Sequence, residues 1–397
     1  MTPSCEGGFC DGYMGGMAVM EVNQSNHGQF PQSTAVHRWT MGSSFVTEFG
    51  AVLEDVEVVY ETHGSLDGTG ANAILVCHAL TGDTHAADGD GRPGWWGGLI
   101  GPGRVLDTDC YYIICVNVLG GCQGSTGPAS VAPGGAHVYG ARFPVVTIRD
   151  MVNVQYALLQ QLGVSKLQLV IGGSMGGMQA LEWAVMQPDY VERAAVIAAN
   201  PAFTAMGLAY NEVMRQAIVS DPDYRHGNYA QVGVSPAKGL AIARMIGMIT
   251  YRTADLFQQR LGRDLGPEGL ADFQIGRYLR HHGDKLVKRF DANSYLTLLR
   301  AMDLHDIGRN RGGLAGAFTR IRAELLWIGI EQDLLYPPDE LRRATELAVR
   351  SGVRARFNQM SSIYGHDAFL LELPQLSQLI HPFLTQDRAV QQAVCDG

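Results

Sequence analysis

One serine, Ser174, stands in the run GGSMG with a glycine two residues before it and another two residues after it. Residues 167–171 before it are of the buried type found in parallel strands, and residues 175–186 after it have the apolar spacing of a helix. A strand that turns directly into a helix strains the backbone of the serine, and side chains at the flanking positions would collide, so Gly172 and Gly176 supply the clearance. This turn predicts a nucleophilic serine whose Oγ projects above the N-terminus of a helix. The alternative is a glycine turn that only packs a helix on a strand.

A serine hydroxyl reacts only when a base takes its proton and a third group orients that base. Asp333 comes three residues after the strand-like run Glu324–Ile330, and His366 lies in the loop after the strand-like run Ala355–Met360. When a catalytic serine lies at a strand-to-helix turn, its acid and then its histidine follow along the chain, each in a loop after a late strand. We therefore predict a triad of Ser174, Asp333 and His366. The alternative for the last two is an ordinary solvated turn residue.

An earlier loop offers donors for the negative charge that forms during attack by the serine. Ala73–Cys77 has the composition of a buried strand and ends in the loop 78–82. In sheets of this kind that loop donates one backbone N–H to the oxyanion, and the residue after the nucleophile donates the other. We assign these two donors to Leu80 and Met175. Together these features indicate an α/β-hydrolase fold.

The elements around these residues alternate between strand and helix, which predicts a mainly parallel sheet covered by helices on both faces. The stretch 45–60 alternates as two strands and is expected to form an antiparallel hairpin that starts the sheet. The pattern further predicts strands at 111–118 and 193–199 and helices at 148–162, 339–350 and 369–384.

The alternation stops between residues 201 and 312, where helical spacing dominates. We interpret 201–312 as an inserted helical lid, with 37–200 and 313–397 forming the core domain. Residues 1–36 are rich in Gly, Ser, Gln and Met and are expected to form a flexible tail.

The composition narrows the class of function. The chain has 397 residues, 46% of them hydrophobic, and a net charge of −9 without a dense Lys/Arg run, which argues against nucleic-acid and anionic-membrane partners. No apolar run approaches the roughly 18 residues of a membrane span, so we expect a cytoplasmic protein. The seven cysteines do not suggest a disulfide framework. Cys5 and Cys10 are spaced like a metal-binding pair, but no histidine pair completes a site, so no metal is predicted.

Several long runs carry a family resemblance. CHALTGD, GWWGGLIGPG, DTDCYYIICVNVLGGCQGSTGP, RFPVVTIRDMV, GGSMGGMQALEWA, ITYRT, RFDANSYL and YGHDAFL resemble the homoserine O-acetyltransferases, which are α/β-hydrolase-fold acyltransferases of methionine biosynthesis. The resemblance spans about residues 38–385. It implies the triad above, a helical lid, a homodimer packed through the lids, and acetyl transfer from acetyl-CoA, as co-substrate, to L-homoserine. Glu331 and Gln332 depart from the smaller polar residues of relatives, which we expect to alter packing around the acid but not the acid itself.

An amino-acid acceptor needs a cation for its carboxylate and an anion for its ammonium group. Arg244 and Tyr251 are seven residues apart, so they lie on one face of a predicted helix. Such a pair is by itself more often a solvated helix face. The family resemblance assigns both to the acceptor carboxylate and Asp367 to the ammonium, with Arg215 as the reserve cation.

The expected mechanism is ping-pong through an acetyl-serine intermediate. Within the family the donor could instead be succinyl-CoA, or the acceptor serine, although the runs 250–253 and RFDANSYL favour acetyl transfer. A plain esterase or thioesterase would share the triad. A hydrolase-fold binding protein without activity is the alternative from another class.

Overall fold

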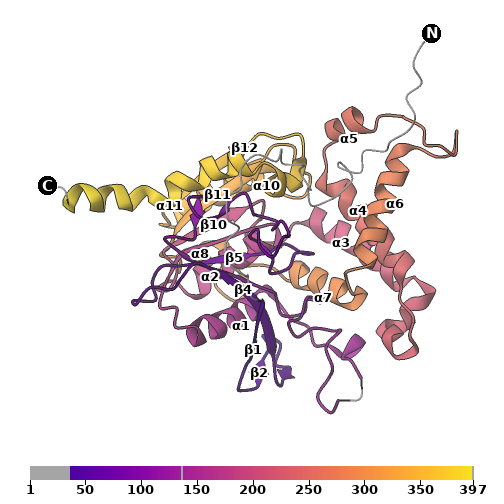
Figure 1. Ribbon diagram of the computed structural model, residues 1–397, viewed down its shortest axis with the longest axis horizontal. Helices are drawn as coiled ribbons and strands as arrows, with labels where there is room; N and C mark the ends of the chain where they lie inside the picture. The colour runs from indigo at the N-terminus through magenta and orange to yellow at the C-terminus, as the bar shows by residue number, and fades with distance from the viewer. Residues whose placement is uncertain (1–35, 136, 396–397) are drawn as a thin grey trace, which may run out of the picture.

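The computed structural model describes residues 36–135 and 137–395, and its centre is a sheet of eight strands. In sheet order these strands are β1 (Val36–Thr40), β4 (Glu57–His63), β8 (Tyr112–Val116), β5 (Ala73–Cys77), β9 (Leu167–Gly173), β10 (Arg193–Ile197), β11 (Glu324–Ile330) and β12 (Ala355–Met360). Every pair from β8 to β12 is parallel, while β4 pairs antiparallel with both β1 and β8. The mainly parallel sheet is therefore confirmed (Figure 1).

The central strands are buried because helices pack against them. All five residues of β5 and of β10 are buried, as expected for strands covered on both faces. Helix α2 (Met175–Met186) packs on β9 and β10, α9 (Pro338–Arg350) packs on β11 and β12, and α1 (Ile148–Gln161) packs on α2. The core elements predicted from 111 to 199 and from 324 to 360 agree with the structure to within two residues at each end.

The start of the sheet differs from the prediction. The stretch 45–60 does not begin the sheet as a hairpin, because β2 (Phe45–Val46) and β3 (Val52–Leu53) form a separate small ladder. The edge strand is instead β1, which pairs with β4. Its sequence VHRWT alternates between exposed and half-buried positions, so no strong hydrophobic pattern marks it.

The C-terminal helix also differs from the prediction of one helix over 369–384. The chain forms a short helix α10 (Ala368–Leu371) and then α11 (Leu373–Cys395). Pro374 explains the break, because proline lacks an N–H and clashes with the preceding turn, yet it fits the first turn of a new helix.

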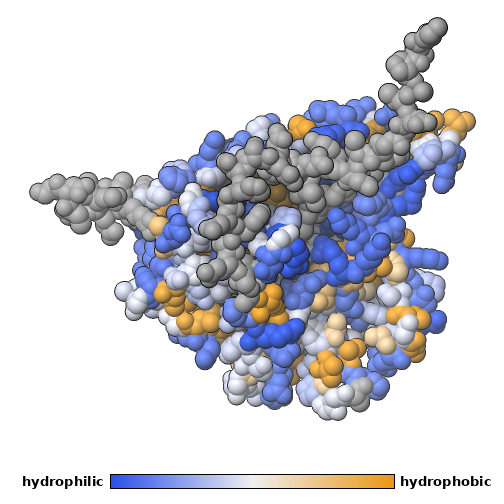
Figure 2. All heavy atoms as spheres, viewed as in Figure 1, coloured by the Kyte–Doolittle hydropathy of each residue, from blue (hydrophilic) through white to orange (hydrophobic). Residues whose placement is uncertain are grey.

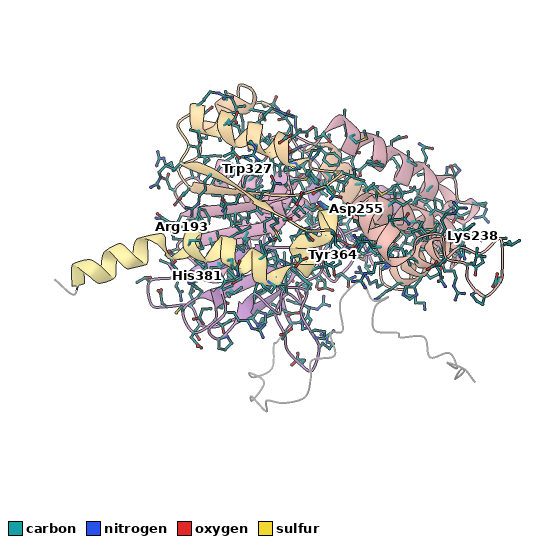
Figure 3. All side chains as sticks on the ribbon, turned by 90° about the horizontal axis from the view of Figure 1, so that it is seen from above. Arg193, Lys238, Asp255, Trp327, Tyr364 and His381 are labelled. Atoms are coloured by element: carbon teal, nitrogen blue, oxygen red, sulfur yellow. The ribbon has the colours of Figure 1, made fainter. Side chains whose placement is uncertain are left out.

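Between β10 and β11 the described chain runs through six α-helices. They are α3 (Ala205–Val219), α4 (Ala237–Tyr251), α5 (Ala254–Arg260), α6 (Gln274–Val287), α7 (Ala292–Asp303) and α8 (Gly313–Phe318). Helices α3 to α6 lie to one side of the sheet in Figure 1, and Figure 3 shows Lys238 at the far end of this helical part from Trp327 in the sheet. The limits 201 and 312 of a lid domain stay a prediction.

The two connections between this helical part and the core run side by side. Phe203 N–H donates to His305 O over 2.9 Å, and Ile307 N–H donates to Pro201 O over 2.9 Å. Backbone bonds of this kind hold the connections against each other.

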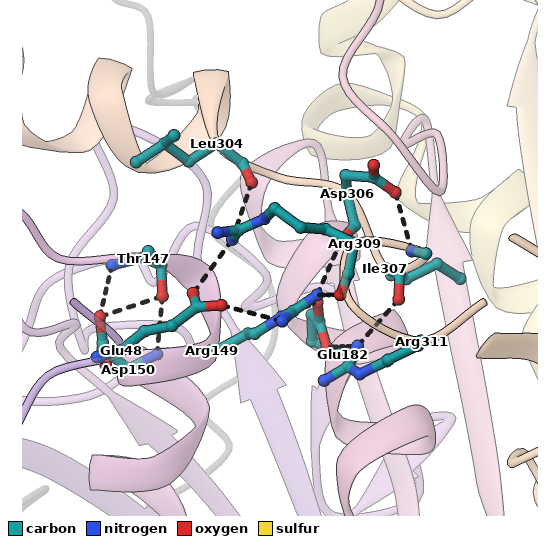
Figure 4. A network of polar contacts seen from close by, with 11 residues as sticks. Glu48, Thr147, Arg149, Asp150, Glu182, Leu304, Asp306, Ile307, Arg309 and Arg311 are labelled. Atoms are coloured by element: carbon teal, nitrogen blue, oxygen red, sulfur yellow. Dashed lines mark hydrogen bonds and ion pairs between the residues drawn. The ribbon is translucent and has the colours of Figure 1, made fainter. Parts of the chain in front are cut away.

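A part-buried ion-pair network fixes this junction to the core (Figure 4). Arg149 of α1 donates to Glu48 over 2.8 Å and to Glu182 of α2 over 3.1 Å, and Arg149 also bonds main-chain carbonyls of the junction loop. Arg309 and Arg311 of that loop donate to Glu48 and Glu182 over 3.0 and 2.7 Å. The helix that follows Ser174 is thus tied directly to the base of the helical part.

In the part of the chain that the structure describes, no helix has the length and apolar character of a membrane span. The same part contains no cluster of three or more side chains that could hold a metal ion. The predicted tail up to residue 35, with Cys5 and Cys10, lies outside the described residues.

Candidate active site

Ser174 lies in a strained turn between β9 and α2. Its backbone has φ 57° and ψ −124°, a conformation that a residue with a side chain adopts only where surrounding structure enforces it. A Cβ on Gly172 would lie 2.5 Å from the Gly176 carbonyl group, and a Cβ on Gly176 would lie 2.1 Å from Cys77 O. The predicted need for glycine at both positions is confirmed, and the crowding comes from the end of β5 as well as from the turn itself.

Asp333 and His366 meet in the interior. The Nδ1–H of His366 donates to Asp333 Oδ2 over 2.8 Å, while Asp333 Oδ1 accepts the backbone N–H groups of Leu335 at 2.8 Å and Tyr336 at 3.0 Å. Both side chains are buried. Both carboxylate oxygens of the aspartate therefore accept hydrogen bonds, which holds the carboxylate and the imidazole in one relative orientation.

The surroundings raise the pKa of His366 above its ordinary value of 6.5. Burial acts in the opposite direction and would lower this pKa, because it disfavours the charged imidazolium. The charge and hydrogen bond of Asp333 outweigh it, and the charge of Asp367 adds to them. An aspartate that stabilises the imidazolium is what a general base needs while it holds a proton.

A small cavity borders Ser174, and two of the aromatic rings that line it lie beside His366. Ser174, Tyr251 and Tyr336 line it, and the rings of Tyr251 and Tyr336 lie 5.6 and 5.2 Å from the ring of His366. No direct hydrogen bond joins Ser174 to His366 among the described contacts; such bonds commonly tighten only when substrate is bound. The complete lining is Leu80, Ser174, Phe203, Asn211, Met214, Thr250, Tyr251, Met302, Leu335 and Tyr336.

The two predicted oxyanion donors lie close to Ser174 and its cavity. Leu80 borders the cavity, and Met175 is the first residue of α2, directly after Ser174. The N–H of a first helical residue has no acceptor one turn earlier. Among the described residues neither N–H has a hydrogen-bond partner, so both are free to bind a developing negative charge.

The predicted acceptor residues gather around Tyr251. Arg244 and Tyr251 are both on α4, with the guanidinium 5.5 Å from the centre of the tyrosine ring. Burial raises the pKa of Tyr251, the positive charge of Arg244 opposes this, and the negative charge of Asp367 adds to it. The structure thus brings Arg244 and Asp367 to the same tyrosine that lines the cavity.

Arg252 is a site residue that the sequence reasoning missed. It is buried, and its Nη2 pairs with Asp367 Oδ2 at 3.1 Å while its Nε donates to Tyr278 at 3.3 Å. Its Nη1 has no partner in the described part of the chain. In the sequence, only the position directly after Tyr251 pointed to Arg252. Helical spacing gave no reason to choose it, because adjacent residues of a helix lie on different faces.

Arg215, the reserve cation, is committed elsewhere. Its guanidinium pairs with Asp303 and Glu212, and Arg215 does not line the cavity. Tyr336 was also missed, although it stands three residues after Asp333 and stacks on the imidazole. Trp96 is fully buried, and its Nε1–H donates to Phe369 O over 2.9 Å.

The departure at Glu331 and Gln332 leaves the acid in place, as expected. Glu331 accepts from Ser361 over 2.6 Å, and Gln332 donates to Asp255 of α5 over 3.2 Å. The two side chains therefore pack the acid loop against its neighbours without touching the contacts of Asp333.

Comparisons with known proteins agree on one family. The family model of the α/β-hydrolase fold matches residues 72–373. The chain is 49% identical over 367 residues to a homoserine O-acetyltransferase of Symbiobacterium thermophilum, with 89% of this chain and 95% of that protein covered.

Solved structures point the same way. A homoserine O-acetyltransferase of Bacillus anthracis superposes with a TM-score of 0.84 at 29% identity, covering 89% of this chain and 98% of the other. The structure of esterase E22 superposes with a TM-score of 0.82 at 33% identity, covering 88% and 100%. Transfer to an amino acid and simple ester hydrolysis thus occur on closely similar backbones.

Proposed function

This chain belongs to the homoserine O-acetyltransferase family of the α/β-hydrolase fold, and from that premise we propose how its residues transfer an acetyl group from acetyl-CoA to the hydroxyl of L-homoserine. The observation that carries the proposal is that His366, hydrogen-bonded to Asp333, lies against the rings of Tyr251 and Tyr336, which line one cavity together with Ser174. An orienting acid, a base and a strained serine are the parts that acyl transfer through a serine ester requires.

In the first half-reaction His366 takes the hydroxyl proton of Ser174, and the serine oxygen attacks the thioester carbon of acetyl-CoA. The backbone N–H groups of Leu80 and Met175 hold the resulting oxyanion. The C–S bond then breaks, the coenzyme A sulfur receives the proton from His366, and the acetyl group remains as a serine ester.

In the second half-reaction His366 takes the proton of the homoserine hydroxyl, whose oxygen attacks the acetyl-serine carbonyl. The ester to Ser174 breaks, and the serine oxygen recovers the proton. Because coenzyme A leaves before homoserine reacts, the kinetics are ping-pong.

The acceptor is held by opposite charges on the two sides of Tyr251. Arg244 makes no ion pair with any described residue, so its charge is available to a ligand carboxylate together with the Tyr251 hydroxyl. Asp367 receives the ammonium group, and its pairing with Arg252 holds the carboxylate in place. A half-buried cation without an internal partner is favoured when a ligand supplies the counter-charge.

The cavity favours an acetyl over a succinyl group. Its described lining contains no lysine or arginine, and Phe203, Met214, Met302 and Leu335 make much of it apolar. A succinyl carboxylate placed there would lose its water without gaining a cation. Succinyl transfer and serine as acceptor remain the alternatives for the assay to decide.

We further propose that the helical part mediates a homodimer. Met206 and Val213 of α3, and Ile242 and Ile249 of α4, are exposed, and within each helix the two residues are seven apart and share one face. In Figure 2 apolar side chains lie between polar ones over the right-hand part of the molecule, where the helical part lies. Exposed apolar stripes on packed helices are typical of protein interfaces. Ile249→Glu should convert a dimer to a monomer in sedimentation experiments, whereas a wild-type monomer would contradict the proposal.

The deciding experiment measures release of coenzyme A thiol from acetyl-CoA or succinyl-CoA, with L-homoserine, L-serine or no acceptor, and with Ser174→Ala as control. Release that requires acetyl-CoA, homoserine and Ser174 is expected. Release that does not depend on the acceptor would mean that the protein is a thioesterase. Hydrolysis of that kind would resemble the activity named for the structural neighbour esterase E22. No release, and no labelling of Ser174 by a fluorophosphonate, would mean an inactive binding protein.

The acceptor site has a matched pair of variants. Arg244→Met removes the unpaired cation and should lower kcat/KM for homoserine about 30- to 1000-fold. This range corresponds to the loss of about 2–4 kcal/mol that is typical of a charge-assisted contact. Aryl-acetate hydrolysis should change little. Arg215→Met removes an arginine of the same helical part that is tied to Asp303 and Glu212, and it should leave kcat/KM within about twofold.

A further inference from the structure

The two oxyanion donors belong to different segments, and something must set the distance and angle between them. Leu80 lies in the loop after β5, whereas Met175 begins α2. Both residues are buried, and neither N–H has a partner among the described residues. Buried N–H groups without partners are rare, and the backbone around them must be held by other contacts.

His78 holds the first donor through a single ring orientation. Its Nδ1 lies 2.8 Å from Ala79 O, and its Nε2 lies 3.2 Å from the backbone N of Val118. A carbonyl only accepts and a backbone N–H only donates, so the ring is the neutral tautomer with its proton on Nδ1. Burial lowers the pKa of His78, which keeps the ring in this neutral form.

The carbonyl that His78 binds is part of the donor itself. Ala79 C=O and Leu80 N–H are the two ends of one peptide unit, which is planar and trans. Fixing the carbonyl therefore aims the N–H in the opposite direction. Gly82 N–H also donates to Ala79 O over 2.9 Å, and a Cβ on Gly82 would lie 2.8 Å from the His78 Cβ, so the loop closes tightly around the ring.

Gln179 links this loop to the second donor. The side chain is fully buried on α2, and its Nε2 lies 3.2 Å from both His78 O and Met175 O. One amide group thus joins the residue before the Ala79–Leu80 peptide to the residue that carries the other N–H.

The orientation of that amide is forced by a chain of contacts. Trp183 Nε1–H, which can only donate, bonds Gln155 Oε1 over 2.8 Å. Gln155 must then present its Nε2 to Gln179 Oε1, at 2.8 Å, which leaves the Nε2 of Gln179 for the two carbonyls. No member of the chain can flip without losing a buried hydrogen bond.

We propose that His78 and Gln179 are positioning residues that set the geometry of the oxyanion hole, His78 by aiming the Leu80 N–H and Gln179 by fixing its separation from the Met175 N–H. The proposal rests on the assignment of those two donors in the proposed function. Neither side chain touches substrate, so both act through the backbone.

The test uses His78→Leu and Gln179→Met, which remove the polar contacts at similar volume. Loss of one oxyanion donor costs about 10²–10³ in kcat, and a displaced donor costs less, so kcat should fall about 10- to 100-fold at a KM within about threefold. His78→Asn keeps a nitrogen in the place of Nδ1 and should stay within about fivefold of wild type. Thr345→Val is the control, because it removes a buried 2.8 Å bond to Leu341 O far from the hole and should leave kcat unchanged.

Each variant is assayed for hydrolysis of p-nitrophenyl acetate as well as for homoserine-dependent acetyl transfer. If wild type lacks the transfer activity, the proposed acceptor is wrong, but the aryl-ester arm still reports on the hole. Folded variants with wild-type kcat, or with only KM altered, would overturn the positioning role. If either substitution prevents folding, Gln155→Met replaces it in the test. We expect kcat of Gln155→Met to fall about 3- to 10-fold, and an unchanged kcat would refute the positioning role.

Discussion

Asp333→Asn should remove activity while leaving the fold intact, because the structure dictates which way the new amide points. Asp333 Oδ1 accepts two backbone N–H groups, from Leu335 and Tyr336. An asparagine keeps its carbonyl oxygen toward these donors, so its NH₂ group faces His366 Nδ1. That nitrogen must then accept, the proton moves to Nε2, and the imidazole can no longer take the proton of Ser174.

The size of the effect follows from the loss of the base and of the charge that stabilises the imidazolium. In serine hydrolases a wrong histidine tautomer costs on the order of 10⁴ in kcat, and we expect about 10³- to 10⁴-fold here, equal to about 4–5.5 kcal/mol of transition-state stabilisation. The denaturation midpoint should stay close to that of wild type, because both backbone bonds to the side chain are kept. Asp333→Ala loses those two bonds, so it should be less stable than Asp333→Asn. Its activity should be no lower than that of Asp333→Asn.

The assay is acetyl transfer to homoserine, measured beside thermal unfolding of wild type and both variants. An Asp333→Asn enzyme with more than about a tenth of the wild-type kcat would refute the argument, since the amide would then have to point the other way or the base would not need its aspartate.

Two further predictions concern pH and stability. Because the pKa of His366 is raised above 6.5 and only the neutral imidazole accepts a proton, kcat/KM should fall as pH drops through a midpoint above 6.5. Asp367→Asn, which removes one negative charge beside that ring, should move this midpoint to lower pH; a midpoint at or below 6.5 in wild type would contradict both expectations. Arg149→Met breaks the junction network and leaves a buried glutamate with one partner fewer, so the free energy of unfolding should drop by about 3–5 kcal/mol in urea titrations. Arg322→Met, which removes an exposed pair with Asp189, should change it by less than about 0.5 kcal/mol, and equal effects of the two substitutions would argue against a role for burial.

The local features of the site could be predicted because each depends on residues that lie close together in the sequence. The glycines around Ser174, the buried run before it and the helix after it lie within twenty residues. The strands before Asp333 and His366 are equally local, and their order along the chain follows from the fold that the Ser174 turn indicates. The roles of these residues are proposals for the assays above, but their elements were predicted to within two residues at each end.

The edge of the sheet could not be predicted in the same way. Strand β1 carries no clear hydrophobic alternation, because an edge strand of an antiparallel pair is covered on few sides. Its partner β4 lies some twenty residues away, and only the pairing between them identifies it as a strand.

The sequence by itself determined the glycine-flanked turn at Ser174, the order of Asp333 and His366 after two late strands, and the family, since each depends on residue types at short separation. Only the tertiary structure decided that Arg252 pairs with Asp367, that Arg215 is committed to other carboxylates, and that His78 and Gln179 brace the oxyanion loop. The pairs Arg252–Asp367, Arg215–Asp303 and His78–Gln179 join residues that are about one hundred positions apart. Their existence depends on how the sheet and helices pack, and packing leaves no period or motif in the chain.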